Sequence, residues 1–131
     1  MIDKIAWIHV ADGRVLVARS RGKDKFYLPG GKREPGEADV ETLVREVREE
    51  LAVEILPSTA KPAGTFEGQA HGHAEGTVVR TTAYMADFAG TPSASSEIEE
   101  IAWLTYADRP RVSLVAQLIF DHLHAAGLLS D

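Results

Sequence analysis

An amphipathic segment in the first half of the chain sets the strongest limit on its architecture. Over residues 37–52 (EADVETLVREVREELA), apolar side chains recur at helical spacing while most remaining positions are charged. That spacing places one apolar stripe along an α-helix and leaves the other sides to water or charged partners. The stripe comprises Val40, Leu43, Val44, Val47 and Leu51. The segment is therefore predicted to be a helix that covers one face of a core.

Short β-branched runs on both sides of this helix predict strands. Residues 4–10 and 14–20 are separated by Ala11-Asp12-Gly13, and an Asp-Gly pair supplies the positive φ angles of a tight hairpin turn. Residues 21–36 are rich in turn formers and are expected to form a loop. Further strands are expected over residues 53–55, 63–67, 78–88 and 100–106.

The end of the chain returns to helical spacing. Residues 112–126 carry it and stop at Gly127, a residue suited to the end of a helix. A chain of 131 residues is long enough for one core and too short for two. We therefore expect a single domain over residues 1–131 with an α+β fold.

The balance of charges limits the partners. The chain has 14 Lys and Arg against 20 Asp and Glu, a net charge of −6, which argues against binding to a nucleic acid backbone or an anionic membrane. Charged residues interrupt the apolar windows near the N-terminus, so neither a signal peptide nor a membrane span is predicted and a cytoplasmic location is expected. Because cysteine is absent, thiolate nucleophiles and Cys-ligated zinc are excluded.

Three carboxylates crowd one side of the predicted helix. Glu46, Glu49 and Glu50 are spaced so that they lie within about 100° of one another around the helix axis. Like charges at these spacings destabilise a helix unless a cation lies between them. An all-oxygen cluster suits Mg²⁺ or Mn²⁺, and Mg²⁺ is usually held by one or two carboxylates together with substrate phosphates. The cluster therefore predicts a site for phosphorylated substrates.

A simpler interpretation is that these charges form the solvated side of the helix. Glu41 and Glu49 would then make ordinary ion pairs with Arg45, four residues from each. The preceding glycines favour the ligand site instead. Gly30 and Gly31 allow the backbone to approach a ligand closely and leave a carbonyl free to act as another metal ligand.

The segment GGKREPGEADVETLVREVREELAVEI resembles the Nudix box, G-x5-E-x7-R-E-U-x-E-E-x-G-U, where U is aliphatic. The matching positions are Gly31, Glu37, Arg45-Glu46-Val47, Glu49-Glu50 and Val53. Ala52 stands where the family has glycine, which puts in doubt only the left-handed backbone geometry there. Since the flanking elements agree in kind, the resemblance implies the Nudix-type α/β/α sandwich with a mixed β-sheet.

The resemblance implies a divalent metal site. Glu49 and Glu50 would be direct ligands, the Gly30 carbonyl would join them, and Glu46 would either ligate or activate water. Glu97 lies in an acidic run before a strand, where the family often supplies a further ligand. A solvated loop is the alternative for Glu97. The expected cofactor is Mg²⁺, with Mn²⁺ as a possible substitute.

The resemblance also implies catalytic roles around these ligands. Arg45 would orient the glutamates by ion pairing, and Glu37 would help to fix Arg45 or a water molecule. With Glu46 and Glu49, these residues make up the predicted catalytic set. The implied reaction is attack of a metal-activated water on one phosphorus of a diphosphate.

Four residues near the box are candidates for substrate binding, namely Tyr27, Gly31, Lys32 and Arg33. The Tyr27 ring would stack on a base or pack beneath the sheet, and the two cations would meet phosphate or water. His71 and His73 alternate with glycine and are interpreted first as a flexible loop rather than a zinc site.

These expectations favour hydrolysis of a small-molecule nucleotide, a (d)NTP or an oxidised dNTP, to a monophosphate and pyrophosphate. ADP-sugars and dinucleoside polyphosphates are alternative substrates. A Nudix-fold nucleotide sensor without turnover is the alternative of another class, but it would usually lack box glutamates. An isoprenoid diphosphate isomerase would need a cysteine that this chain lacks. Monomer and homodimer both stay open.

Overall fold

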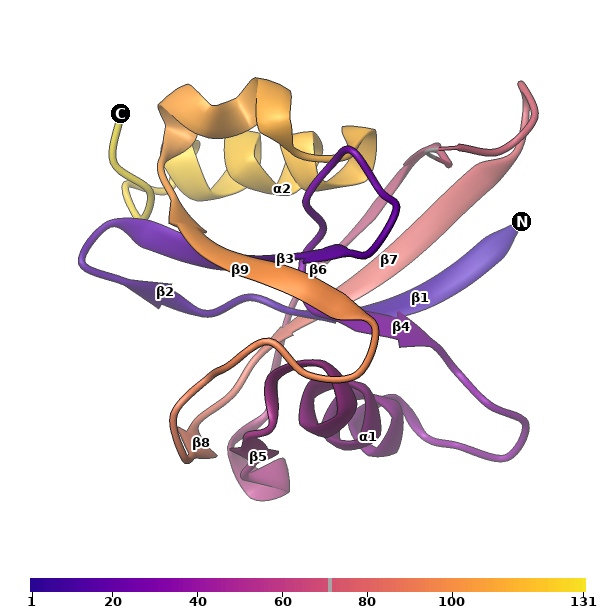
Figure 1. Ribbon diagram of the computed structural model, residues 1–131, viewed down its shortest axis with the longest axis vertical. Helices are drawn as coiled ribbons and strands as arrows, with labels where there is room; N and C mark the ends of the chain where they lie inside the picture. Colours follow the sequence, from indigo (N-terminus) through magenta and orange to yellow (C-terminus); the bar gives the residue numbers. More distant parts are fainter. Residues whose placement is uncertain (71) are drawn as a thin grey trace.

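The computed structural model describes residues 1–70 and 72–131 (Figure 1). The strands are β1 (Ile2–Trp7), β2 (Val10–Ala11), β3 (Arg14–Ser20), β4 (Gly30–Lys32), β5 (Glu54–Ile55), β6 (Lys61–Gln69), β7 (Val78–Met85), β8 (Phe88–Ala89) and β9 (Ile98–Leu104). The helices are α1 (Asp39–Leu51) and α2 (Leu114–Ala125), with 3₁₀ turns at Pro57–Thr59 and Tyr106–Arg111.

The strands form two main sheets between the two helices. The larger has the order β4-β1-β7-β6 and is mixed, because β1 runs parallel to β7 while its other pairs are antiparallel. The second has the order β2-β3-β9 and is antiparallel, and β5 pairs with β8 apart from both. Helices α1 and α2 lie on opposite sides of these sheets (Figure 1). The predicted α+β class and α/β/α sandwich are confirmed.

The predicted opening hairpin is correct only at its tip. β2 and β3 pair across Asp12 and Gly13, whose φ angles of 53° and 75° are those of the expected tight turn. β1 does not continue this ladder but pairs with β7 and β4 in the other sheet. The chain passes from one sheet to the other between Trp7 and Val10. The predicted strand over residues 4–10 therefore contributes to both sheets, through β1 and β2.

The predicted loop over residues 21–36 contains a short strand. β4 lies within it and pairs antiparallel with β1, with Ile5 opposite Gly31. Gly30, Gly31 and Lys32 include no β-branched residue, so their own preference does not predict a strand. They are extended because they form hydrogen bonds with the edge of β1. The other elements are found where expected, with ends shifted by a few residues; the long strand predicted over 78–88 stops at Met85, and β8 follows.

Two clusters of buried side chains fill the spaces between layers. On β3, Leu16 belongs to the cluster beneath α1, whereas Val15 and Val17 belong to the cluster beneath α2. This alternation is the period of two that a strand imposes on its side chains. Within the part of the chain that the structure describes, no helix is long and apolar enough to cross a membrane.

Candidate functional site

The glycines of β4 allow this strand to lie directly against α1. A Cβ atom added to Gly31 would stand 2.5 Å from the Glu46 carboxyl carbon, so the carboxylate occupies the space of a missing side chain. At Gly30 the φ angle is +145°, and an added Cβ would lie 2.0 Å from the Ile5 carbonyl oxygen. Gly30 therefore requires glycine, because its backbone conformation and the β1 backbone exclude a side chain, whereas a side chain at Gly31 would displace the Glu46 carboxylate.

Arg45 joins the glycine strand, the loop before α1 and a helix glutamate. Its Nε donates to Glu37 Oε2 (2.7 Å) and its Nη2 to Glu37 Oε1 (2.9 Å), a bidentate pair. Its Nη1 donates to Glu46 Oε1 (2.8 Å), and its Nη2 also reaches the Lys32 carbonyl (3.2 Å). Arg45 thus contacts both Glu37 and Glu46, the two glutamates to which the sequence pattern linked it.

Glu37 is itself held from three sides. Besides Arg45, its Oε1 accepts hydrogen bonds from the Thr42 hydroxyl and the Glu34 N–H, both at 2.9 Å. The hydrogen bonds from Arg45, with further help from Glu34, lower the pKa of Glu37 to about 2. The Glu37 carboxylate is therefore charged throughout the physiological range and raises the pKa of Arg45 in turn.

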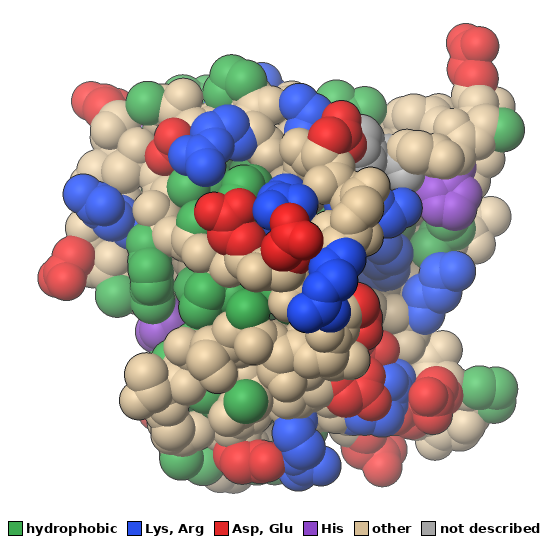
Figure 2. Space-filling view, in the orientation of Figure 1, with side chains coloured by type: hydrophobic (Ala, Val, Ile, Leu, Met, Phe, Trp, Pro, Cys, Tyr) green, Lys and Arg blue, Asp and Glu red, His purple; other side chains and the backbone are tan. Residues whose placement is uncertain are grey.

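The ion pairs of Arg45 with Glu41 and Glu49, expected for a solvated helix, are not the main contacts of Arg45. The Arg45–Glu49 distance is 3.8 Å, longer than the contacts of Arg45 with Glu37 and Glu46. Glu41 instead accepts a hydrogen bond from the Ala38 N–H (2.8 Å) and closes the start of α1. Figure 2 shows acidic and basic side chains interleaved where α1 and the loop before it reach the surface.

Glu50 is the most buried carboxylate of the box. Its Oε1 accepts a hydrogen bond from the Gly30 N–H (3.0 Å). Burial raises the pKa of Glu50 to about 8, and the charges of Glu46 and Glu97 add to this shift. Burial also raises the pKa of Glu46. A desolvated group of acids of this kind is stabilised when a cation neutralises it.

Glu97 reaches this group because its loop is fastened to the end of α1. The Ser93 N–H donates to the Leu51 carbonyl and the Ser95 N–H to the Glu50 carbonyl, both at 3.0 Å. These bonds satisfy carbonyls that the last helical turn leaves unpaired. The exposed Glu97 side chain accepts from the Ser96 hydroxyl (2.9 Å), and its charge raises the pKa of both Glu46 and Glu50.

The donor set fits a hard divalent cation in its chemistry, since the gathered acids supply only oxygen. Across residues 1–70 and 72–131, no three acidic or His side chains are gathered tightly enough to hold an ion by themselves. Glu46 is turned to Arg45 and Glu50 to the Gly30 N–H, while the Glu49 side chain is 51% exposed. The three glutamates lie on one side of α1, as their spacing predicts. Their carboxylate groups nevertheless point to different partners.

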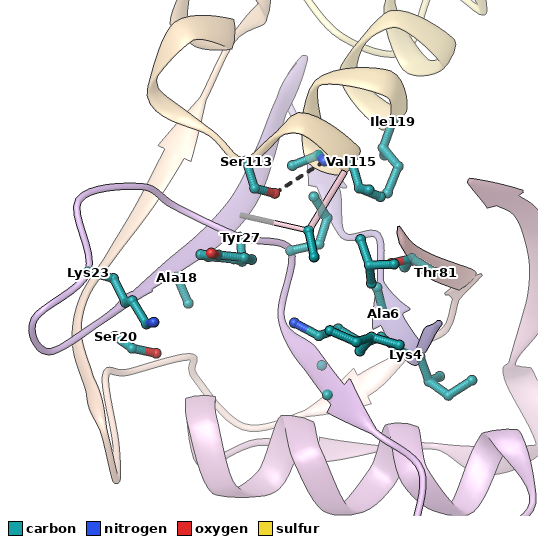
Figure 3. A pocket seen from close by; sticks show the side chains of 18 of the residues that line it. Lys4, Ala6, Ala18, Ser20, Lys23, Tyr27, Thr81, Ser113, Val115 and Ile119 are labelled. Atoms are coloured by element: carbon teal, nitrogen blue, oxygen red, sulfur yellow. Dashed lines mark hydrogen bonds between the residues drawn. The ribbon is translucent and has the colours of Figure 1, made fainter. Parts of the chain in front are cut away.

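A cavity of about 210 Å³ has Glu50 in its wall. One end is lined by Gly30, Gly31 and Glu50, and the other by the first turns of α2, including Val115 and Ile119 (Figure 3). Tyr27 and Gly31, two of the predicted substrate-binding residues, both line this cavity. His73 also contributes to the wall; His71 lies outside the described residues.

The other two predicted substrate contacts lie elsewhere. Arg33 pairs with Asp3 (2.8 Å) and with Asp39, which in turn accepts from the Tyr84 hydroxyl (2.7 Å). Arg33 thus fastens the start of α1 to β1 and β7 instead of lining the cavity. Lys32 is exposed, and its carbonyl serves Arg45.

Sequence reasoning missed Lys4, which lines the same cavity as Glu50. The alternation along β1 carries the signal, because Ile5 and Trp7 face the cluster beneath α1 and the even-numbered residues face the other side. A charged residue at an inward position of a strand is unusual. The inward position of Lys4 depends on the pairing of β1 with β7, which the local sequence does not encode.

Comparison with known proteins identifies the relatives of this arrangement. A model of the NUDIX domain matches residues 4–120. The chain is similar to the CTP pyrophosphohydrolase of Escherichia coli strain K12, with 31% identity over 108 residues that span 79% of this chain and 75% of that protein.

Solved structures have the same fold. The solution structure of the E. coli ORF135 protein superposes with a TM-score of 0.75 at 27% identity, covering 96% of this chain and 92% of that one. A MutT NUDIX hydrolase from Burkholderia pseudomallei superposes with a TM-score of 0.77 at 22% identity, covering 92% and 95%. The second likeness is one of fold alone.

Proposed function

Because this chain belongs to the Nudix family, we propose that it hydrolyses a (d)NTP or an oxidised dNTP to a monophosphate and pyrophosphate with the help of Mg²⁺. That the chain is a pyrophosphohydrolase follows from its family and from the E. coli relative. The substrate and the metal are the proposed part. Family members generally use divalent metal ions.

One observation supports the nucleotide above all, namely that a single cavity contains Glu50 of the box together with apolar side chains. Glu50 and Gly31 stand at one end, and Val115 and Ile119 at the other. A nucleobase has apolar faces that such walls accommodate, while its phosphates need the polar end. A nucleoside bound in this cavity would place its phosphates beside the acids of α1.

The proposed metal ligands are Glu49, Glu50, the Gly30 carbonyl and Glu97. A bound Mg²⁺, or Mn²⁺ in its place, would neutralise phosphate charge and lower the pKa of a coordinated water. The helix glutamates share one side of α1, and the hydrogen bonds of the Ser93 and Ser95 N–H groups hold the loop before Glu97 at the end of the same helix. Carboxylates that repel one another here would be stabilised by the ion.

Glu46 is the proposed acceptor of the water proton. Its Oε1 is held by Arg45, which leaves Oε2 to take the proton, and burial raises the pKa of Glu46. Arg45 and Glu37 are positioning residues, since their ion pair fixes the carboxylate that acts. Glu49, more exposed and farther from Arg45, is assigned to the metal.

A substrate panel tests this function. Phosphate and pyrophosphate release is measured for CTP, the dNTPs, 8-oxo-dGTP, ADP-ribose and dinucleoside polyphosphates, each with Mg²⁺, with Mn²⁺ and with excess EDTA. Pyrophosphate release from one triphosphate class, abolished by EDTA, is the expected result. Turnover confined to ADP-ribose or dinucleoside polyphosphates would overturn the proposed substrate, and nucleotide binding without any turnover would favour a sensor.

A pair of variants tests the placement of the metal. Glu50→Gln should lower turnover by about 100-fold or more and weaken Mg²⁺ binding, with the melting temperature preserved. Glu54→Gln is the matched control, because Glu54 is exposed at the same end of α1 and pairs only with Arg48 among the described residues. Full activity in Glu50→Gln would show that the metal site is misplaced.

A further inference from the structure

Lys4 is a charged residue at an inward position of a strand. On β1, Ile5 and Trp7 are completely buried beneath α1, and Lys4 lies on the opposite face, opposite Thr81 of β7 in the sheet register. The Lys4 side chain is half-buried, and this burial, together with the charges of Lys32 and Lys23, lowers its pKa. A desolvated ammonium is costly unless an anion compensates it.

The Lys4 ammonium has no carboxylate partner among the described residues. The charges of Glu50 and Glu46 act on it without a hydrogen bond or ion pair, and its Nζ lies over the Tyr27 ring, 5.3 Å from the ring centroid. Lysines on strands often extend their charged end into water. Lys4 instead directs its nitrogen across the cavity toward Tyr27 (Figure 3).

The charges that line the cavity favour an anion beyond the acidic end. Among the described lining residues, Glu50 is the one acid, while Lys4 and Lys23 are cations that approach from opposite sides (Figure 3). Lys4 lines the same cavity as Glu50 and the apolar side chains of Val115 and Ile119. A ligand that filled the apolar part of the cavity and reached Glu50 would therefore share the cavity with the Lys4 ammonium.

We propose that Lys4 binds the phosphate that stays on the cavity-bound half of the substrate, the α-phosphate in the case of a nucleoside triphosphate. This inference rests on the proposed function and adds a phosphate contact outside the box. An ammonium is a compact point charge suited to phosphate oxygens. Because that phosphate is retained by the monophosphate product, Lys4 should hold the product as well as the substrate.

Binding without turnover tests the proposal. CMP and dGMP are titrated against cytidine and deoxyguanosine in excess EDTA, by NMR or calorimetry, on the wild-type protein, Lys4→Met and Lys4→Arg. Lys4→Met should weaken monophosphate binding by about 10- to 100-fold and leave nucleoside binding unchanged, with part of the loss restored in Lys4→Arg. Lys61→Met is the control, because Lys61 is an exposed strand lysine outside this cavity.

Each other outcome overturns the proposal. A wild-type protein that binds neither monophosphate more tightly than its nucleoside has no phosphate contact of this kind. Equal weakening of nucleoside and monophosphate by Lys4→Met would assign Lys4 to the nucleoside. Unchanged binding in Lys4→Met would leave Lys4 as a lysine that reaches solvent. Melting curves check folding, and Lys4→Met should melt no lower than the wild type because a desolvated charge is removed.

Kinetics separate this inference from the proposed function. For any substrate that the panel identifies, Lys4→Met should raise KM far more than it lowers kcat, since the contact is present in the ground state as well. A panel without turnover would overturn the proposed function while the EDTA titrations still decide the role of Lys4. Turnover of a triphosphate with no effect of Lys4→Met would overturn the role of Lys4 alone.

Discussion

Ala52 ends α1 in a conformation that suits glycine. Its φ and ψ angles are 58° and 31°, in the left-handed region, and its N–H donates to the Arg48 carbonyl. An L-residue with a Cβ is strained there by about 1–2 kcal/mol. Ala52 therefore has the left-handed conformation expected of the glycine in the family pattern, at the cost of backbone strain.

Ala52→Gly should raise the free energy of unfolding by about 0.5 to 1 kcal/mol, measured by denaturant unfolding, because relief of strain exceeds the added freedom of the unfolded chain. The control is Ala126→Gly at the end of α2, where φ is −81° and no strain exists to relieve. A gain of equal size in both variants would contradict the explanation.

The Glu37–Arg45 pair should make stability depend on acid pH. The pKa of Glu37 is lowered to about 2 in the folded protein, so the pair contributes fully above the unfolded pKa near 4.5 and is lost as pH falls toward 2. The wild-type protein should therefore be more stable than Glu37→Gln at pH 6, and the difference should shrink steadily between pH 4.5 and 2. Urea titrations at several pH values measure it; a difference independent of pH would contradict the shift.

The predictability of the site differs from residue to residue. Glu37, Arg45, Glu46 and Glu50 belong to one contiguous motif, so their mutual approach follows from a helix and the loop before it. The ion pairs of Arg33 with Asp3 and Asp39 depend on β1 lying beside the start of α1. No spacing along the chain encodes that neighbourhood, so the sequence alone leaves Arg33 as a candidate for contact with phosphate or water.

At the scale of elements, the helix was predictable and the short strand was not. α1 repeats an apolar stripe over 13 residues, which local periodicity detects. β4 has three residues and no pattern, and it is a strand because β1 offers a free edge. The separation of β1 from the hairpin likewise depends on β7, which lies more than 70 residues away along the chain.

Val47→Ala should destabilise the protein by about 2 to 3 kcal/mol, because Val47 is completely buried between α1 and the sheet and a cavity would remain. Its activity well below the melting temperature should persist, since the side chain faces away from the acids. Val44→Ala, on the same helix but only partly buried, should cost less. Chemical unfolding and initial rates measure the two effects, and a loss of activity at full folding would contradict them.

At the scale of the whole molecule, the two buried clusters are not independent. β3 gives Leu16 to one cluster and Val15 and Val17 to the other, so neither can lose its packing without moving the strand they share. The central sheets thus connect the half that carries the acids with the half that carries the cavity wall.

The protein should therefore unfold in one transition. Calorimetry should give equal calorimetric and van't Hoff enthalpies, and Val47→Ala beneath α1 and Ile119→Val beneath α2 should each shift that single transition to lower temperature. Two transitions, each moved by only one of the variants, would show that the layers fold separately.

The attachment of residues 93–95 to the end of α1 limits how this part of the chain can vary during evolution. Both bonds use backbone N–H groups, which every residue except proline possesses, so Ser93 and Ser95 can be exchanged for most side chains without losing them. Proline at either position, or one residue inserted before Glu97, would remove a bond or displace the carboxylate. The side chains of this segment can therefore vary, whereas its length is constrained because the length sets the position of Glu97.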